Sequence, residues 1–213
     1  MSFRNKRVTD FESKDCSGCA LCVACCPKNC ITMQSDDLGY MRPVIDDSLC
    51  IDCGLCTKKC IIENPEALSH PILTAAAIRS DEEKLILSSS GGVFAVIAEQ
   101  LISKGWMVAG CIMDEQLTPR HVLTSNIQVV KQMYGSKYVQ SNTEGVYKDV
   151  AEVLQKGKKV LFSGTPCQVA AVKRFTKNNE NLLTVEVICH GVPNVEMLHS
   201  YLDLHSRASI KKM

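Results

Sequence analysis

Cysteines in the first 60 residues repeat in a pattern that restricts the fold of this chain more than any other feature. The chain has 13 cysteines, and most of them precede residue 61. The first run reads Cys-x-x-Cys-x-x-Cys-x-x-x-Cys-Pro over residues 16–27, and the same offsets recur over residues 50–60. A short loop of this spacing can wrap three thiolates around one iron–sulfur cluster. The sequence therefore predicts a module with two 4Fe–4S clusters, and with it a role in electron transfer.

The fourth cysteine of each run is predicted to bind the cluster of the other run, as in two-cluster ferredoxins. Cluster I then takes Cys16, Cys19, Cys22 and Cys60. Cluster II takes Cys50, Cys53, Cys56 and Cys26. Small residues between the ligands, Gly18 and Gly54, are expected to let backbone N–H groups approach the cluster sulfides.

Two other uses of the cysteines fit the pattern less well. Structural zinc sites also use Cys-x-x-Cys pairs, but zinc needs two such pairs rather than two complete four-cysteine runs. Disulfides are disfavoured because we expect a cytoplasmic chain, where thiols stay reduced. The cysteines outside the ligand sets, Cys25, Cys30 and Cys111, are predicted to be small buried hydrophobic residues rather than redox groups.

Charge and hydropathy exclude several classes of protein. Lys and Arg number 24 against 23 Asp and Glu, so the balance offers no support for nucleic-acid binding or for a membrane surface. The first 15 residues are polar, and charged or amide side chains interrupt the later apolar stretches. We expect neither a secretion signal nor a membrane span, and predict a cytoplasmic protein.

Cysteine density divides the chain into two predicted domains. Residues 1–65 form the two-cluster domain, residues 66–86 a connector, and residues 87–213 an α/β domain. The predicted fold is an α+β ferredoxin-like two-cluster module followed by an α/β domain with a mostly parallel or mixed sheet. Strands are expected at 72–78, 106–113, 121–124, 159–162 and 182–188, with an extended stretch at 137–140. Helices are expected at 93–103, 127–133, 143–155, 166–177 and 195–205.

Two loops of the second domain have the composition of anion-binding loops. Ser89, Ser90, Gly91 and Gly92 lie directly before a predicted helix, whose free N–H groups favour a phosphate such as that of a dinucleotide. Ser136 and Lys137 follow Gly135 in a second flexible turn. Plain helix capping by serine and an ordinary solvated lysine are the alternatives.

Two further motifs follow consecutive predicted strands. Gly164 and Thr165 lead into a helix whose first turn contains Cys167, where a thiolate would be stabilised. Cys189 and His190 follow the next strand. In a parallel sheet both motifs open onto the same edge, so Cys167, Cys189 and His190 are candidate catalytic residues. The alternative is that Cys189 ends a buried strand and His190 makes a local turn hydrogen bond.

The chain resembles the beta subunit family of coenzyme F420 hydrogenase/dehydrogenase. The resemblance rests on the cysteine runs, then RSDEEKLILSSSGGVFAVIAEQL, GSKYVQS, KKVLFSGTPCQVAAVKRF and LLTVEVICHGVPN, in this order. It implies an iron–sulfur flavoprotein in which FAD exchanges electrons between the clusters and an organic hydride acceptor such as coenzyme F420. It also implies that SSSGG, GSKY, GTPCQ and CHG line the flavin and substrate region.

The resemblance makes an oxidoreductase subunit the leading hypothesis, with a redox partner protein or sister subunit. Members of the family continue well beyond the last predicted helix, so the chain is expected to be truncated or a fragment. The alternative function is a non-catalytic ferredoxin-like electron carrier or docking module.

Overall fold

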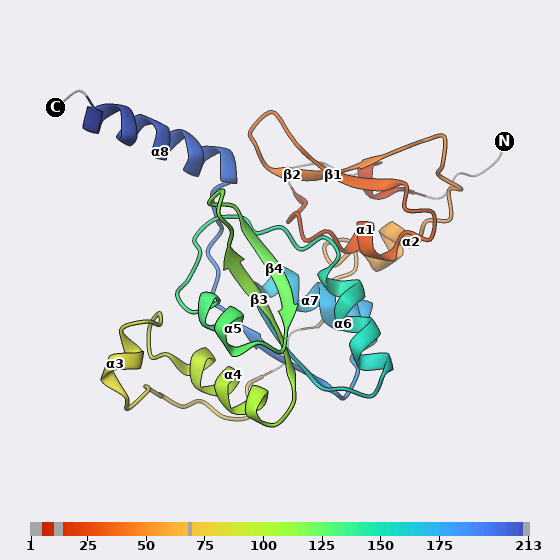
Figure 1. Cartoon of the computed structure of the whole chain (residues 1–213). Helices are drawn as coiled ribbons and strands as arrows, with labels where there is room; N and C mark the ends of the chain where they lie inside the picture. The colour runs from red at the N-terminus through yellow and green to blue at the C-terminus, as the bar shows by residue number, and fades with distance from the viewer. Residues whose placement is uncertain (1–5, 11–14, 68–69, 211–213) are drawn as a thin grey trace.

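The computed structural model describes residues 6–10, 15–67 and 70–210 of the chain. An N-terminal cysteine-rich module lies against a larger part built on a four-stranded sheet (Figure 1). The helix α8, Val195–Ile210, projects away from the sheet at the C-terminal end. No helix among these residues has both the length and the apolar character needed to cross a membrane.

The N-terminal module turns the sequence repeat into a structural repeat. A short antiparallel sheet joins β1, Ile31–Ser35, to β2, Met41–Ile45. The helices α1, Leu21–Cys25, and α2, Leu55–Lys59, each place the third cysteine of a run at their second residue. Both follow a residue in the left-handed region, with φ of 58° at Ala20 and 68° at Gly54. A short 3₁₀ helix, η1, Val8–Asp10, precedes the first run.

The connector between the two parts contains no strand in its described residues. The expected strand at 72–78 is wrong: this segment is coil, and Ile72 and Leu73 are largely exposed. An apolar run favours a strand where a neighbouring strand can pair with it, and no described strand lies alongside this one. A short helix, α3, Glu82–Leu85, follows.

The main sheet is mixed, as predicted. Its strands are β3, Met107–Met113, β4, Pro119–Thr124, β5, Val160–Gly164, and β6, Leu182–Glu186. They lie in the order β4-β3-β5-β6, with β3 and β4 antiparallel and the other two pairs parallel. The expected extended stretch at 137–140 is a loop outside this sheet.

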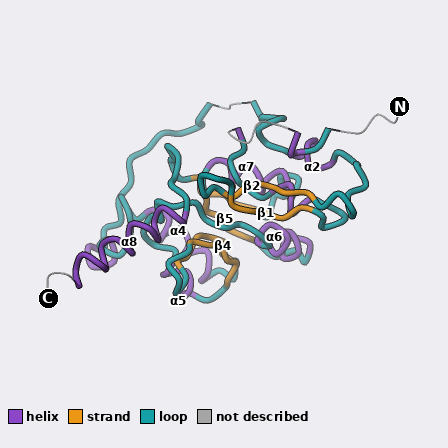
Figure 2. Tube along the Cα trace, turned by 90° about the horizontal axis from the view of Figure 1, so that it is seen from above, coloured by secondary structure: helices purple, strands orange, loops and turns teal. Residues whose placement is uncertain are grey.

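Helices cover both faces of the sheet (Figure 2). They are α4, Val93–Ser103, α5, Ile127–Gln132, α6, Val146–Gln155, and α7, Pro166–Phe175, each within a few residues of its predicted range. Leu161 of β5 packs toward α4 and α5, whereas its neighbours Val160 and Phe162 pack toward α6 and α7. This alternation is the period of two that a strand imposes on its side chains.

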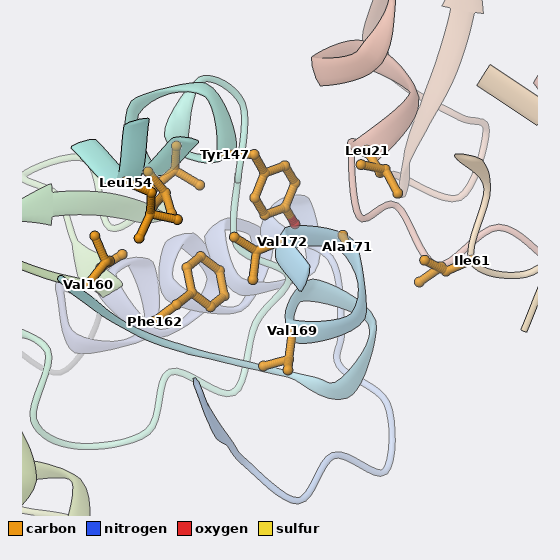
Figure 3. Close-up of a cluster of buried hydrophobic side chains, with 12 residues drawn as sticks. Leu21, Ile61, Tyr147, Leu154, Val160, Phe162, Val169, Ala171 and Val172 are labelled. Carbon is orange, nitrogen blue, oxygen red and sulfur yellow. The ribbon is translucent and has the colours of Figure 1, made fainter. Parts of the chain in front are cut away.

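The hydrophobic core on the α6 and α7 side extends into the cysteine-rich module. Leu21 of α1 and Ile61 join the cluster that contains Tyr147, Phe162 and Val172 (Figure 3). Leu21 is 1% exposed. The helices α6 and α7 are therefore sandwiched between the sheet and the module, and they bring the second part of the chain to the cysteines.

Candidate functional site

Four cysteines from the two runs line one pocket. They are Cys26, from the first run, and Cys50, Cys53 and Cys56, from the second. This is the crossed set that the sequence predicts for cluster II. The ends of α1 and α2 supply Cys26 and Cys56, so the two repeats must pack together to form the pocket. The remaining lining includes Arg7, Pro27, Lys28, Ile31, Ile45, Ile51, Asp52 and Gly54.

A fifth thiol, Cys30, lies at the same pocket. Its sulfur is 3.4 Å from the sulfur of Cys26, and the residue is 5% exposed. Burial and the neighbouring sulfur of Cys26 raise the pKa of Cys30 to about 12. Cys30 is therefore buried, as predicted, but it contacts a predicted ligand, a position that sequence spacing gave no reason to expect.

The first three cysteines of the first run also lie together. Burial raises the pKa of Cys19 to about 11, and nearby Cys16 adds to the increase. Burial and the charges of Cys19 and Cys16 raise the pKa of Cys22 as well. Thiols in such surroundings ionise when a metal centre compensates their charge. The fourth predicted member, Cys60, directly follows α2.

Within the described ranges, no three His, Cys, Asp or Glu side chains are arranged to hold one metal ion. Two buried polar atoms of the cysteine-rich module have no hydrogen-bond partner among the described residues: Ser17 Oγ, between two predicted ligands of cluster I, and Arg7 Nε, at the pocket of cluster II. Leaving a buried polar atom unpaired is unfavourable, so a bound group that accepts from it fits both places.

Two hydroxyl groups of the second domain bind the backbone of Cys19. The hydroxyl of Tyr147, on α6, donates to the carbonyl oxygen of Cys19 at 2.9 Å. The hydroxyl of Thr143 donates to the same oxygen at 3.0 Å. Tyr147 is 1% exposed and Thr143 2% exposed, so the carbonyl is shielded from water and fully paired. Burial raises the pKa of Tyr147 well above its ordinary value, so its phenol stays protonated and donates.

Other cysteine carbonyls are held in the same way. Arg174, near the end of α7, donates to the carbonyl of Cys60 at 3.0 Å. Arg42 of β2 donates to the carbonyl of Cys16. These contacts join distant parts of the sequence, and the residue types alone gave no sign of them.

Gln140 fills the space beside Gly18. A Cβ atom on Gly18 would overlap Gln140 Nε2, and Gly18 has a φ of 68°. Gln140 Oε1 accepts from the N–H of Met41 at 3.2 Å, and the Gln140 N–H donates to the carbonyl of Pro193 at 2.9 Å. Glycine is therefore needed at position 18 for both its conformation and its lack of a side chain.

Cys167 lies beside the predicted ligands of cluster I. It is in the first turn of α7, and its sulfur is 3.2 Å from Thr165 Oγ1. Cys167 and Cys19 both pack against the core that α6 and α7 share with the module, and the charge of Cys167 contributes to the raised pKa of Cys19. The predicted catalytic cysteine and the predicted cluster are thus neighbours.

The two predicted anion-binding loops are also neighbours. The N–H of Ser136 donates to Ser89 Oγ at 2.7 Å. The N-cap of α4 is Gly92, with a φ of 68° and no side-chain capping bond, so serine capping does not account for this loop. Ser88 Oγ is buried without a hydrogen-bond partner among the described residues. The loop therefore has a hydroxyl, that of Ser88, and helix N–H groups that its own side chains do not bind.

Lys137 has a structural role at the end of α5. Its ammonium group donates to the carbonyls of Gln132, at 2.6 Å, and of Tyr134, at 3.1 Å. Gln132 is the last residue of α5 and Tyr134 follows it closely, so the cation lies at the C-terminal end of the helix, where it is favourable. Partial burial lowers the pKa of Lys137. One of its three N–H donors remains for a ligand after these two bonds.

A chain of hydrogen bonds links the GSKYVQS segment to GTPCQ. Gln168 Nε2 donates to Ser141 Oγ at 2.8 Å, and Gln168 Oε1 accepts from the N–H of Thr165 at 3.0 Å. Ser141 Oγ lies 3.2 Å from His121 Nδ1, and His121 Nε2 lies 3.1 Å from the carbonyl of Ser163. Burial lowers the pKa of His121 to about 4, so the ring is neutral and this carbonyl fixes its proton on Nε2.

Cys189 and His190 follow the sheet edge as expected, but their contacts are local. Residue Gly164 of β5 is opposite Glu186 of the parallel β6, so GTPCQ and CHG both leave the carboxyl edge of the sheet. The N–H of Gly191 donates to the sulfur of Cys189 at 3.4 Å. His190 is exposed. Catalytic roles for these two residues stay predictions.

Comparisons with known proteins agree with the sequence resemblance. Residues 157–213 match the family model for the C terminus of the beta subunit of coenzyme F420 hydrogenase/dehydrogenase. The uncharacterized protein MJ1349 of Methanocaldococcus jannaschii is 26% identical over 216 residues, which cover 85% of this chain and 58% of that protein. The chain thus spans less than two thirds of the length of this relative.

A solved structure is also similar to part of the chain. It is a xenon derivative of the F420-reducing NiFe hydrogenase complex from Methanosarcina barkeri. The similarity covers 59% of this chain and 47% of that chain, at 19% sequence identity and a TM-score of 0.48.

Proposed function

We propose that this chain, whose residues 157–213 match the model for the C terminus of the coenzyme F420 hydrogenase/dehydrogenase beta subunit, is an iron–sulfur flavoprotein subunit of an oxidoreductase. In this proposal residues 1–65 carry two 4Fe–4S clusters and residues 87–213 bind FAD. The clusters supply one-electron transfer, and FAD couples it to hydride transfer with an organic acceptor such as coenzyme F420.

The observation that carries the proposal is the packing of GTPCQ and α6 against the first cysteine run. Tyr147 and Thr143 hold the carbonyl of Cys19, and Cys167 packs beside it. An electron leaving cluster I would therefore enter the second domain over a short distance. A chain in which the two parts had separate functions would not need this contact.

The supporting observation for the flavin is the pairing of the two predicted anion-binding loops. Ser89 and Ser136 are hydrogen bonded to each other, and the orphaned Ser88 hydroxyl and the N–H groups at the start of α4 are free to bind a phosphate. The role of these residues would be to hold the dinucleotide. The GSKYVQS segment runs from this place to Ser141, at GTPCQ, and so connects the proposed flavin site to the proposed cluster site.

Cluster II is the proposed entry or exit for electrons exchanged with a sister subunit or another redox partner. Cys53 is exposed, and so are Leu49 and Ile51 beside the pocket. The contacts with α6 and α7 are made instead by Cys19 and Cys60, both predicted ligands of cluster I. Cluster II would then face a partner while cluster I faces the second domain.

The test is to purify the chain without oxygen and to measure iron, acid-labile sulfide and flavin. The proposal expects about eight iron atoms per chain, a broad absorption near about 400 nm, and FAD released by acid. Dithionite-reduced methyl viologen should then drive hydride transfer to coenzyme F420. Bound zinc and a colourless protein would refute the proposal.

A chain with both clusters but no flavin would favour the second function, a ferredoxin-like electron carrier. Such a protein would reduce acceptor proteins but would not transfer hydride to coenzyme F420. To separate this outcome from loss of the cofactor during purification, the measurement is repeated after incubation with FAD. Ser89→Ala is the matched variant, because it removes the hydrogen bond to Ser136 and should weaken FAD binding without loss of iron.

A further inference from the structure

A buried arginine lines the pocket of cluster II. Arg7 is 9% exposed and lies with Cys26, Cys50, Cys53 and Cys56 around the same space. Arginine is almost never buried unless its charge is compensated. Its position near the N-terminus, in a polar segment, gave no reason to expect it in the cysteine pocket.

The segment that carries Arg7 is held in place on both sides. The hydroxyl of Thr57, on α2, donates to the carbonyl of Lys6 at 2.6 Å. The N–H of Arg7 donates to Asp10 Oδ2 at 2.7 Å. The side chain of Val8 packs against the buried group that includes Cys30 and Cys56. The arginine is therefore fixed by its neighbours rather than free to leave the pocket.

The guanidinium group has capacity beyond its protein partners. Its Nη1 binds the carboxylate of Asp47, and its Nε lies 3.6 Å from Asp52 Oδ1. The Nε atom is buried and makes no hydrogen bond within the described part of the chain. Hydrogen bonding to Asp47 and, to a smaller extent, to Cys50 raises the pKa of Arg7, against the effect of burial. Arg7 thus combines a permanent positive charge with an unused donor at a pocket of thiols.

We propose that Arg7 tunes cluster II: its charge and its Nε donor raise the reduction potential of the cluster. This inference rests on the proposed function, because it needs the cluster to be present. A cluster gains one negative charge on reduction, and a nearby cation stabilises that state. Hydrogen bonds to the sulfurs act in the same direction.

The predicted ligands of cluster I provide an internal reference. The arginines that contact them, Arg42 and Arg174, bind the carbonyls of Cys16 and Cys60 and do not line the pocket of cluster II. A change at Arg7 should therefore affect one cluster and leave the other unchanged. Within a single protein sample, cluster II reports the local effect of the change, and cluster I reports any general loss of structure.

The experiment is a redox titration of the cluster-loaded chain, followed by electron paramagnetic resonance. Cys53→Ala, which removes a predicted ligand of cluster II, identifies the signal of that cluster. In Arg7→Gln, the ratio of reduced to oxidised cluster II at a fixed potential should fall about tenfold, which is 59 mV for one electron. In Arg7→Lys, which keeps the charge, this ratio should fall less. The potential of cluster I should not change in either variant. Lys104 is an exposed cation at the end of α4, and in Lys104→Gln the potentials of both clusters should stay the same.

A second variant covers the case in which Arg7→Gln does not retain cluster II. Asp47→Asn keeps the guanidinium group and removes the charge of its exposed partner, so the potential of cluster II should rise. If the potential of cluster II is unchanged in Arg7→Gln, the role of Arg7 is overturned while the proposed function stands. If Arg7→Gln loses the cluster, an unchanged potential in Asp47→Asn has the same meaning. A wild-type chain that binds no clusters would instead overturn both.

Discussion

Removing the hydroxyl of Tyr147 tests the contact between the second domain and the first cysteine run. In Tyr147→Phe the ring stays in the core, where it lies 6.1 Å from the ring of Phe162, and the bond to the Cys19 carbonyl is lost. The carbonyl keeps its bond from Thr143. One hydrogen bond contributes about 1 kcal/mol net, so we expect unfolding to become about fivefold more favourable.

The double variant sharpens this prediction. Tyr147→Phe with Thr143→Val leaves the buried carbonyl of Cys19 without a partner, which costs about 1–3 kcal/mol beyond the sum of the two single changes. Urea unfolding of the two single variants and the double variant measures the difference. The signal of cluster I in electron paramagnetic resonance should change as well, because Cys19 is a predicted ligand.

Tyr134→Phe is the matched control. It removes another half-buried phenol, which donates to Glu99 at 2.9 Å, far in sequence from the cysteines. This variant should lower stability and leave the signal of cluster I unchanged. If the double variant loses no more stability than the single variants together, or if Tyr134→Phe alters cluster I equally, the argument that these hydroxyls position Cys19 is wrong.

Three other predictions follow from buried polar groups. Arg79→Ala should cost about 1.5–3 kcal/mol in urea unfolding, because the half-buried Glu99 loses two N–H donors, at 3.1 and 2.7 Å, and keeps only the hydroxyl of Tyr134. Between pH 7 and pH 5 the chain should lose about 2 kcal/mol of stability through His121, whose pKa is lower in the folded than in the unfolded state. The contribution is full above about pH 6.5 and falls as the pH drops toward 4, and His121→Gln should flatten this part of the profile. Cys30→Ala should keep both clusters, whereas Cys26→Ala should lose iron from cluster II; equal iron loss in both would contradict the ligand assignment.

The elements of the second domain were predictable because each has a local sequence pattern. Apolar residues at helical spacing predicted α4 over 93–103, and the structure has the same bounds. Thr165 and Pro166 marked the start of α7 because they suit the first turn of a helix. The strand expected at 72–78 failed because strand formation depends on a pairing partner, which the apolar run itself does not reveal.

The sequence by itself grouped four cysteines that the structure brings to one pocket, where Cys30 joins them. The spacing of the two runs and the crossing rule named Cys26 with Cys50, Cys53 and Cys56, and the structure lines one pocket with these four. Ligand spacing within a short loop is a local property, so it can be read directly. The resemblance to the family, which the match of residues 157–213 to the family model supports, was likewise readable from motifs in their order along the chain.

Only the tertiary structure decided what surrounds these cysteines. Tyr147 is 128 residues from Cys19, and Arg174 is 114 residues from Cys60, yet both bind the carbonyls of predicted ligands. Arg7 belongs to a polar segment of the sequence, and it is buried at the pocket. Such contacts depend on how α6, α7 and the N-terminal segment pack in three dimensions, and packing between distant elements leaves no periodic pattern in the sequence.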